Sequence, residues 1–163
     1  MNFISQDKQF VVTISQECID SIVEHIKKAA VYETGGILIG AYSDDLGTAA
    51  ISQITGPTID SKGGFTWFNR GIKGLKELLK RYWDVKLYYL GEWHFHPNAK
   101  PIPSNQDKKQ MREIARSNQY RCPEPIMIIV GGNWQCYEIS VFIQTLTGES
   151  YELKAVDLNI GEM

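Results

Sequence analysis

Cysteine is scarce in this 163-residue sequence, and its three occurrences, Cys18, Cys122 and Cys136, form no Cys-x-x-Cys pair. An odd number of thiols at such spacing does not indicate a disulfide framework, so we expect free thiols and a cytoplasmic location. The alternative is a nucleophilic cysteine with His25 as its base. We disfavour it, because charged neighbours in the sequence place His25 on an expected solvent face.

Long hydrophobic runs and an excess of positive charge are also missing. The longest apolar runs, such as residues 126–130, fall far short of the roughly 20 residues that span a membrane, and the N-terminus shows no signal-peptide pattern. Seventeen basic against nineteen acidic residues give a formal net charge of −2. Because no basic field is available to collect nucleic acid or anionic lipid, we expect neither as a partner.

What the sequence does contain is typical of one soluble globular domain. Hydrophobic residues make up 43% and charged residues 22%, and the length suits a single domain over residues 1–163. The predicted strands cover residues 10–14, 36–42, 49–55, 65–68, 85–96, 126–130 and 135–143. The predicted helices cover residues 15–30, 69–82 and 104–117. The polar tail from residue 145 is expected to fray or to add an edge strand. This order predicts an α/β fold with a mixed sheet flanked by helices.

One stretch, from Glu92 to Asp107, carries the chemistry. His94 and His96 are two apart on a predicted strand, so they project from the same face and can bind one ion together. Asp107 falls in the first turn of the next helix, facing the sheet, where an unpartnered carboxylate is costly to bury. Two histidines and one carboxylate leave the fourth position of a tetrahedral zinc open for water. Each feature alone has a plainer explanation: His-x-His pairs are common, and Ser104-x-x-Asp107 is also a capping box.

Taken together, the spacing His-x-His-x7-Ser-x2-Asp resembles the signature of the JAMM (JAB1/MPN/Mov34) metalloproteases, in which an upstream Glu precedes His-x-His-Pro and Ser-x-x-Asp. The segment Glu33 to Gly40, Glu-Thr-Gly-Gly-Ile-Leu-Ile-Gly, is similar to the family's Glu-x-x-Gly-x-Leu-x-Gly strand. The resemblance spans about residues 10–143. It implies a single JAMM/MPN domain with a cytidine-deaminase-like α/β/α sandwich.

The resemblance also implies a role for each motif residue. It gives one zinc ion per chain, held by His94, His96 and Asp107. Glu33 becomes the general base for the attacking water, and Ser104 helps to hold the oxyanion. These roles suit the chemistry, because zinc lowers the pKa of water toward about 7 and a carboxylate within reach can carry the proton.

Two residues depart from the family pattern. Phe95 stands between the histidines where the family usually has Ser or Thr, but it points to the opposite face, so metal ligation should survive. Glu92 precedes His94 by two residues, where many members have Trp. It could orient a histidine, replace Glu33 as the base, or be a plain exposed strand residue. We favour Glu33 as the base because of its Gly-x-Leu-x-Gly context.

The compact length and the segment Gly-Glu-Trp-His-x-His-Pro resemble a bacterial branch of the family. Its members are encoded beside ubiquitin-activating-like and conjugating-like enzymes, notably in type II CBASS antiviral operons. The resemblance implies an isopeptidase that cuts the amide bond after the C-terminus of a ubiquitin-like protein or a conjugated nucleotidyltransferase. The operon's activating and conjugating enzymes are further expected partners.

Two other functions stay open. A non-catalytic MPN scaffold is disfavoured by the complete motif, and a metal assay separates it. A RadC-like DNA-associated protein is disfavoured by the acidic balance, and a salt-dependent DNA titration separates it. Trp67, Phe68 and Tyr88 are candidates for lining a substrate groove, although core packing is our favoured explanation for each.

Overall fold

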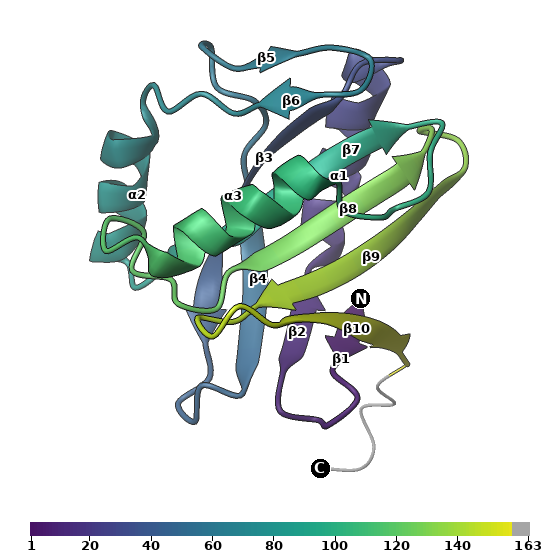
Figure 1. Ribbon diagram of the computed structural model, residues 1–163. Coiled ribbons are helices and arrows are strands. Elements are labelled where there is room, and N and C mark those ends of the chain that lie inside the picture. The colour runs from purple at the N-terminus through teal and green to yellow at the C-terminus, as the bar shows by residue number, and fades with distance from the viewer. Residues whose placement is uncertain (158–163) are drawn as a thin grey trace.

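The computed structural model describes residues 1–157, in which helices cover both faces of one large sheet (Figure 1). The helices are α1 (Gln16–Ala29), α2 (Leu75–Asp84) and α3 (Asn105–Arg116). The strands are β1 (Asn2–Ile4), β2 (Val11–Ile14), β3 (Thr34–Tyr42), β4 (Thr48–Ile54), β5 (Lys62–Gly63), β6 (Phe68–Asn69), β7 (Tyr88–Pro97), β8 (Ile126–Gly132), β9 (Tyr137–Gln144) and β10 (Ser150–Val156). The predicted mixed α/β fold is confirmed.

Eight strands form a sheet in the order β1-β10-β9-β8-β7-β3-β4-β2, and β1 also pairs with β2, so the sheet closes on itself. The pairs β7–β8 and β2–β4 are parallel, and the other neighbours are antiparallel. The tail from residue 145 was expected to fray or form an edge strand. Instead, β10 pairs with both β9 and β1 and buries Leu153; residues 158–163 lie outside the described part.

Two apolar layers hold the helices to the sheet. The inner layer joins α1 to the inward side chains of all eight strands, so α1 lies within the curve of the sheet. The outer layer joins α2 and α3 to β3, β7 and β8; its buried members are Ile37, Ile39, Leu75, Tyr89, Met111, Ile114, Cys122, Met127 and Ile129. In Figure 1, α3 crosses the face of β7 and β8. This layering places the start of α3 over the end of β7.

Helix α2 begins at Leu75, later than the predicted start at Asn69. The intervening backbone is held in another conformation, because the Asp60 carboxylate accepts the N–H groups of Ile72 (3.0 Å) and Lys73 (3.1 Å). Ile72, which lies within the predicted helix range, is therefore outside the helix and exposed.

The predicted strand at residues 65–68 is also wrong in detail. Residues 64–67 form the turn between the short strands β5 and β6, closed by the Gly64 N–H donating to the Trp67 carbonyl (2.8 Å). Trp67 is consequently exposed, against our preference for core packing, whereas Phe68 is buried. Tyr88 is half-buried and lies edge-on against Trp83.

His25 is not on a solvent face, contrary to our expectation. It is half-buried against Trp93, with ring centroids 5.9 Å apart, and burial lowers its pKa, as does the nearby Lys28 charge. Burial raises the pKa of the Cys18 thiol, and it raises that of Cys122 to about 11. The cysteines are free. Among the described residues, no helix has the length and apolar character needed to cross a membrane.

Candidate metal centre

Strand β7 divides its side chains between the core and the site. Trp93 and Phe95 are fully buried in the inner layer, so Phe95 does point away from the histidines, as predicted. Glu92, His94 and His96 alternate with them and lie on the outer face, where each is less than a tenth exposed. The alternation of one strand thus presents a carboxylate and two imidazoles together.

Asp107 reaches this face from the first turn of α3. Its carboxylate accepts the Ser104 N–H (2.7 Å) through Oδ2, while its own N–H donates to Ser104 Oγ (3.1 Å). This is the capping box that the sequence allowed. The same carboxylate has Oδ1 2.7 Å from His94 Nδ1 and Oδ2 3.3 Å from His96 Nε2. The cap therefore fixes the carboxylate that joins the two histidines.

His94, His96 and Asp107 form one buried group of possible metal ligands. One donor atom from each lies within 4.8 Å of the others. Two imidazoles and a carboxylate suit a divalent transition metal, and a site built from three protein ligands keeps a position open. The predicted ligand set is therefore brought together, and its donors fit such an ion.

In the metal-free state, the charges of this group stabilise one another. Burial alone would lower the pKa of His94, but the hydrogen bond to Asp107 and the neighbouring Glu92 carboxylate outweigh it and raise this pKa to about 9. Burial would raise the pKa of Asp107, but its hydrogen bonds to His94 and His96 hold this pKa well below its usual range. A protonated His94 therefore occupies the centre at neutral pH.

This protonation predicts a pH-dependent affinity for zinc. A metal ligand must be deprotonated, so zinc binding displaces the His94 proton whenever the pH lies below about 9. We expect the zinc association constant to rise about tenfold per pH unit near pH 7 and to level off as the pH approaches 9. Competition titrations with a chromogenic chelator, corrected for the chelator's own protonation, would measure it. An affinity independent of pH in this range would contradict the assignment of His94 as a ligand.

The same pKa shift makes the stability of the metal-free protein depend on pH. Because the folded pKa of His94 lies above its ordinary 6.5, its stabilising effect is complete below that value and is lost as the pH rises through about 9. Zinc binding and proton binding therefore compete for the same centre.

Glu33 lies immediately before β3 and faces the same centre. Burial raises its pKa, and the nearby charges of His96, Asp107 and His94 influence it in turn. Its backbone is fixed, since the Glu33 N–H donates to the Gly64 carbonyl (2.8 Å). The β5–β6 hairpin therefore holds the predicted base beside the predicted ligands.

The ring of His94 is enclosed on two sides by neighbouring elements. Phe68 of β6 lies edge-on to it, with ring centroids 5.4 Å apart. A Cβ added to Gly35 of β3 would lie 2.8 Å from the His94 ring, inside contact distance. A glycine is therefore required here for the strand to approach the histidine closely.

Ser104 is the exposed N-cap of α3. Its Oγ accepts the Asp107 N–H, which leaves the hydroxyl hydrogen free to donate outward. The structure thus brings all five predicted site residues to the region where β3, β7 and α3 meet.

Glu92 is not an exposed strand residue: it is fully buried and both of its carboxylate oxygens accept hydrogen bonds. Its Oε1 accepts from Arg70 Nε (2.8 Å) and the Tyr89 hydroxyl (3.2 Å), and its Oε2 accepts from Gln110 Nε2 (2.8 Å). Burial opposes the charge, yet the neighbouring His94 and the Arg70 guanidinium keep its pKa below the usual value.

Sequence reasoning missed Arg70, Tyr89 and Gln110, because none belongs to the motif. Tyr89 reaches Glu92 through a β-bulge at Gly91, where φ is 149° and the register of β7 against β3 shifts. A glycine at this position of a strand was the one available signal.

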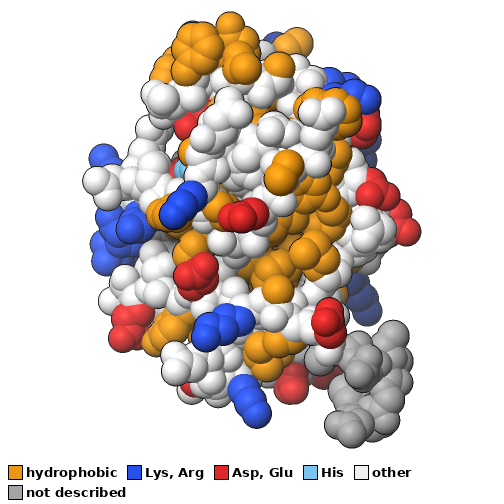
Figure 2. All heavy atoms as spheres, turned by 90° about the vertical axis from the view of Figure 1, so that its right-hand side faces the viewer, with side chains coloured by type: hydrophobic (Ala, Val, Ile, Leu, Met, Phe, Trp, Pro, Cys, Tyr) orange, Lys and Arg blue, Asp and Glu red, His pale blue; other side chains and the backbone are white. Residues whose placement is uncertain are grey.

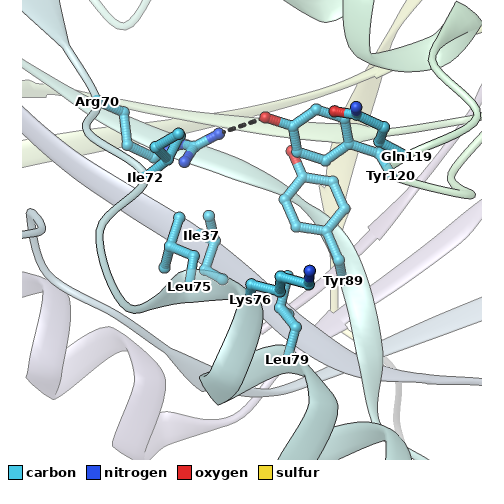
Figure 3. Close-up of a pocket in the computed structure, with 9 residues that line it drawn as sticks. All are labelled: Ile37, Arg70, Ile72, Leu75, Lys76, Leu79, Tyr89, Gln119 and Tyr120. Atoms are coloured by element: carbon cyan, nitrogen blue, oxygen red, sulfur yellow. Dashed lines mark hydrogen bonds between the residues drawn. The ribbon is translucent and has the colours of Figure 1, made fainter.

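A cavity of about 540 Å³ lies between α2 and the sheet, beside these residues (Figure 3). Ile37, Leu75 and Leu79 supply apolar walls, while Arg70 and Tyr120 lie hydrogen-bonded above them. None of the five predicted site residues lines this cavity. Two of its lining residues, Arg70 and Tyr89, donate hydrogen bonds to Glu92.

Comparison with known proteins agrees with this geometry. A family model for prokaryotic homologs of the JAB domain matches residues 15–143. The chain is 47% identical over 133 residues to a "CD-NTase/cGAS isopeptidase" of Enterobacter hormaechei subsp. hoffmannii, covering 82% of this chain and 74% of that protein. It is 28% identical over 131 residues to the "Probable metalloprotease y4qB" of Sinorhizobium fredii, covering 76% and 79%.

A solved structure has the same fold at low sequence identity. The solution structure of protein DSY2949 from Desulfitobacterium hafniense superposes with a TM-score of 0.64 at 18% identity, covering 86% of this chain and 88% of that one. The fold, the buried His-His-Asp group and the family match over residues 15–143 lead to one conclusion. This chain belongs to the prokaryotic JAB-domain family, in agreement with the JAMM resemblance of its motif.

Proposed function

We propose that this protein is a zinc-dependent isopeptidase that hydrolyses the amide between the C-terminal carboxyl of a conjugated protein and an amine. The observation that carries the proposal is the buried group of His94, His96 and Asp107 with the Glu33 carboxylate facing it. The names of the relatives, an isopeptidase and a metalloprotease, support the same class of reaction.

Each residue of the centre has a proposed task. His94, His96 and Asp107 hold the ion, and Asp107 is itself fixed by the cap at Ser104. When bound, zinc supplies a Lewis acid that polarises a carbonyl and lowers the pKa of water to about 7. Glu33 takes a proton from the attacking water and returns it to the leaving amine. A carboxyl whose pKa is raised by burial is suited to both transfers.

Ser104 is proposed to stabilise the developing negative charge. Its hydroxyl hydrogen is free, and it stands at the N-terminus of α3, where the helix dipole favours negative charge. The same serine also caps the helix, so its replacement by alanine removes both effects.

The proposed substrate is a conjugated nucleotidyltransferase, cut after its C-terminus. Two relatives named CD-NTase/cGAS isopeptidase support this class, the second in Pseudomonas aeruginosa at 26% identity. Operon-encoded activating and conjugating enzymes would form the bond that this protein cuts, within a bacterial antiviral system. The free cysteines fit the cytoplasmic location that such a role requires.

The β5–β6 hairpin is the proposed docking place for the substrate tail. Among residues 1–157, β5 and β6 pair only with each other, so each has an outer edge, and Glu33 is tied to this hairpin. The rings of Phe65 and Tyr32 lie against each other there, with their centroids 4.9 Å apart, and both side chains are exposed, as is Trp67. Figure 2 shows hydrophobic side chains gathered at the top of the molecule, where Figure 1 places this hairpin. An extended tail can add to such an edge as a strand.

This mode of docking predicts that cleavage depends on the residues before the scissile bond. The test is a fusion of the operon's nucleotidyltransferase to a reporter through its native C-terminus, compared with a fusion whose last residues are scrambled. We expect cleavage of the native fusion and at least about tenfold slower cleavage of the scrambled one, which corresponds to 1.4 kcal/mol. Equal cleavage of both fusions would reject the docking mode, and cleavage of neither would reject the substrate.

A further inference from the structure

The fully buried Glu92 has no part in the ligand set or in proton transfer, although burying a carboxylate is costly without a specific partner. It lies on the side of His94 opposite Asp107. Glu92 Oε2 is 3.5 Å from His94 Nε2, while Asp107 Oδ1 is 2.7 Å from His94 Nδ1. The imidazole is therefore placed between two carboxylates, one at each nitrogen.

His94 Nε2 is the one buried side-chain nitrogen or oxygen without a hydrogen-bond partner in the described part of the chain. The acceptor is already in place, because a shift of the ring by a few tenths of an ångström would bring Nε2 within the 2.7–3.2 Å of a hydrogen bond. A metal-binding histidine commonly donates its second ring N–H to a carboxylate, which fixes the tautomer and raises the basicity of the ligand nitrogen.

We propose that Glu92 is a positioning residue for His94: it accepts the Nε2 hydrogen and thereby commits Nδ1 to the metal, and Arg70 holds Glu92 in place for this purpose. This inference rests on the proposed metal centre and assigns a task that neither the motif nor the family match supplies.

Arg70 is suited to this task by its contacts and its place in the chain. Its guanidinium lies 2.7 Å from Glu92 Oε1 through one terminal nitrogen and donates to the same oxygen through Nε at 2.8 Å. It also donates to the Gly71 carbonyl and the Tyr120 hydroxyl, so its orientation is fixed from both ends. In Figure 3 the guanidinium points toward Tyr120 across the top of the cavity.

Phe68 and Arg70, two residues apart in one segment, both act on His94. Phe68 packs edge-on against its ring, and Arg70 fixes the carboxylate that faces its free nitrogen. Because Arg70 neutralises Glu92, the pair adds no net charge to the centre. Glu92 contributes an oriented acceptor.

A pair of variants tests the orientation directly, with zinc affinity as the measurement. In Glu92→Gln the amide oxygen must face the donors of Arg70, which turns the amide NH2 toward His94 and removes the acceptor. We expect zinc binding to weaken about 10–100-fold, the usual effect of losing such a partner. Removing the guanidinium as well, in Arg70→Met with Glu92→Gln, frees the amide oxygen to turn back to His94. The logarithm of the zinc association constant should then recover by at least half of what the single variant lost.

The rescue separates positioning from a structural role, because a second substitution in a purely structural ion pair would not restore metal binding. Thermal unfolding of the metal-free variants records their folding independently. Wild-type zinc affinity in Glu92→Gln, or a double variant no tighter than the single one, would overturn the proposal. Since zinc binding is measured without substrate, a failure of the proposed isopeptidase activity leaves this result unaffected.

Should Glu92→Gln fail to fold alone, two variants without a buried unpaired charge decide the question. The double variant Arg70→Met/Glu92→Gln retains an acceptor for His94, and Arg70→Met/Glu92→Met retains none. Replacing a buried ion pair by apolar side chains is often neutral for stability. We expect the glutamine pair to bind zinc about tenfold more tightly than the methionine pair. Equal affinities would overturn the proposal.

Discussion

Glu33→Gln should keep the fold and the bound zinc while turnover falls about 10²–10⁴-fold, the usual effect of losing a general base. The substitution keeps the size of the side chain and removes its ability to carry a proton. Glu33 contributes no atom to the group of His94, His96 and Asp107, so the ion should stay. Single-turnover cleavage of the conjugate, with zinc content measured on the same samples, checks both parts.

Glu92→Gln is the matched control, since both variants replace one buried or half-buried carboxylate near the same centre. Glu92→Gln should lose activity because it binds zinc more weakly, so excess zinc should restore its cleavage at least in part. Excess zinc should not restore cleavage by Glu33→Gln. If Glu92→Gln is inactive at saturating zinc and Glu33→Gln remains active, the assignment of the base is wrong.

Replacing both His94 and His96 by alanine should abolish zinc binding and, with it, all cleavage above background. Two of the three protein ligands are then gone, and one carboxylate does not hold the ion. At free zinc about 1,000 times the dissociation constant, the wild type gains about 4.1 kcal/mol of stability from the ion, and the variant should gain none. Elemental analysis and thermal unfolding with and without zinc measure these effects.

His25→Gln provides the control for the loss of a histidine, since His25 is the only histidine of the sequence besides His94 and His96. His25 lies on α1 and packs against Trp93, a member of the inner apolar layer. The His25→Gln variant should retain one equivalent of zinc. Stoichiometric zinc in the His94 and His96 double variant would show that the ion is bound elsewhere.

The metal group could be predicted from the sequence because its geometry follows from local rules. Strand alternation alone puts His94 and His96 on one face, and the capping pattern of Ser104 and Asp107 fixes the turn that brings the carboxylate to them. Phe95 was correctly assigned to the opposite face for the same reason.

The parts that could not be predicted depend on contacts between distant segments. Helix α2 begins later than predicted because the Asp60 carboxylate, which precedes the β5–β6 hairpin, accepts hydrogen bonds from the N–H groups of Ile72 and Lys73. The environment of Glu92 depends on Arg70 and Gln110, which lie far from it in sequence. The periodicity of the sequence does not indicate hydrogen bonds between residues so far apart. The closing strand β1 is only three residues long, too short for a period to be read.

One ion at His94, His96 and Asp107 should be sufficient and necessary for amide hydrolysis. Titration of zinc into chelator-treated protein, while conjugate cleavage is followed, measures this requirement. Cleavage should be absent after chelation, should rise in proportion to added zinc, and should stop rising at one equivalent. Prior alkylation of the exposed Cys136 should change nothing, because no thiol takes part. Cleavage that survives chelation but is abolished by alkylation would contradict the account.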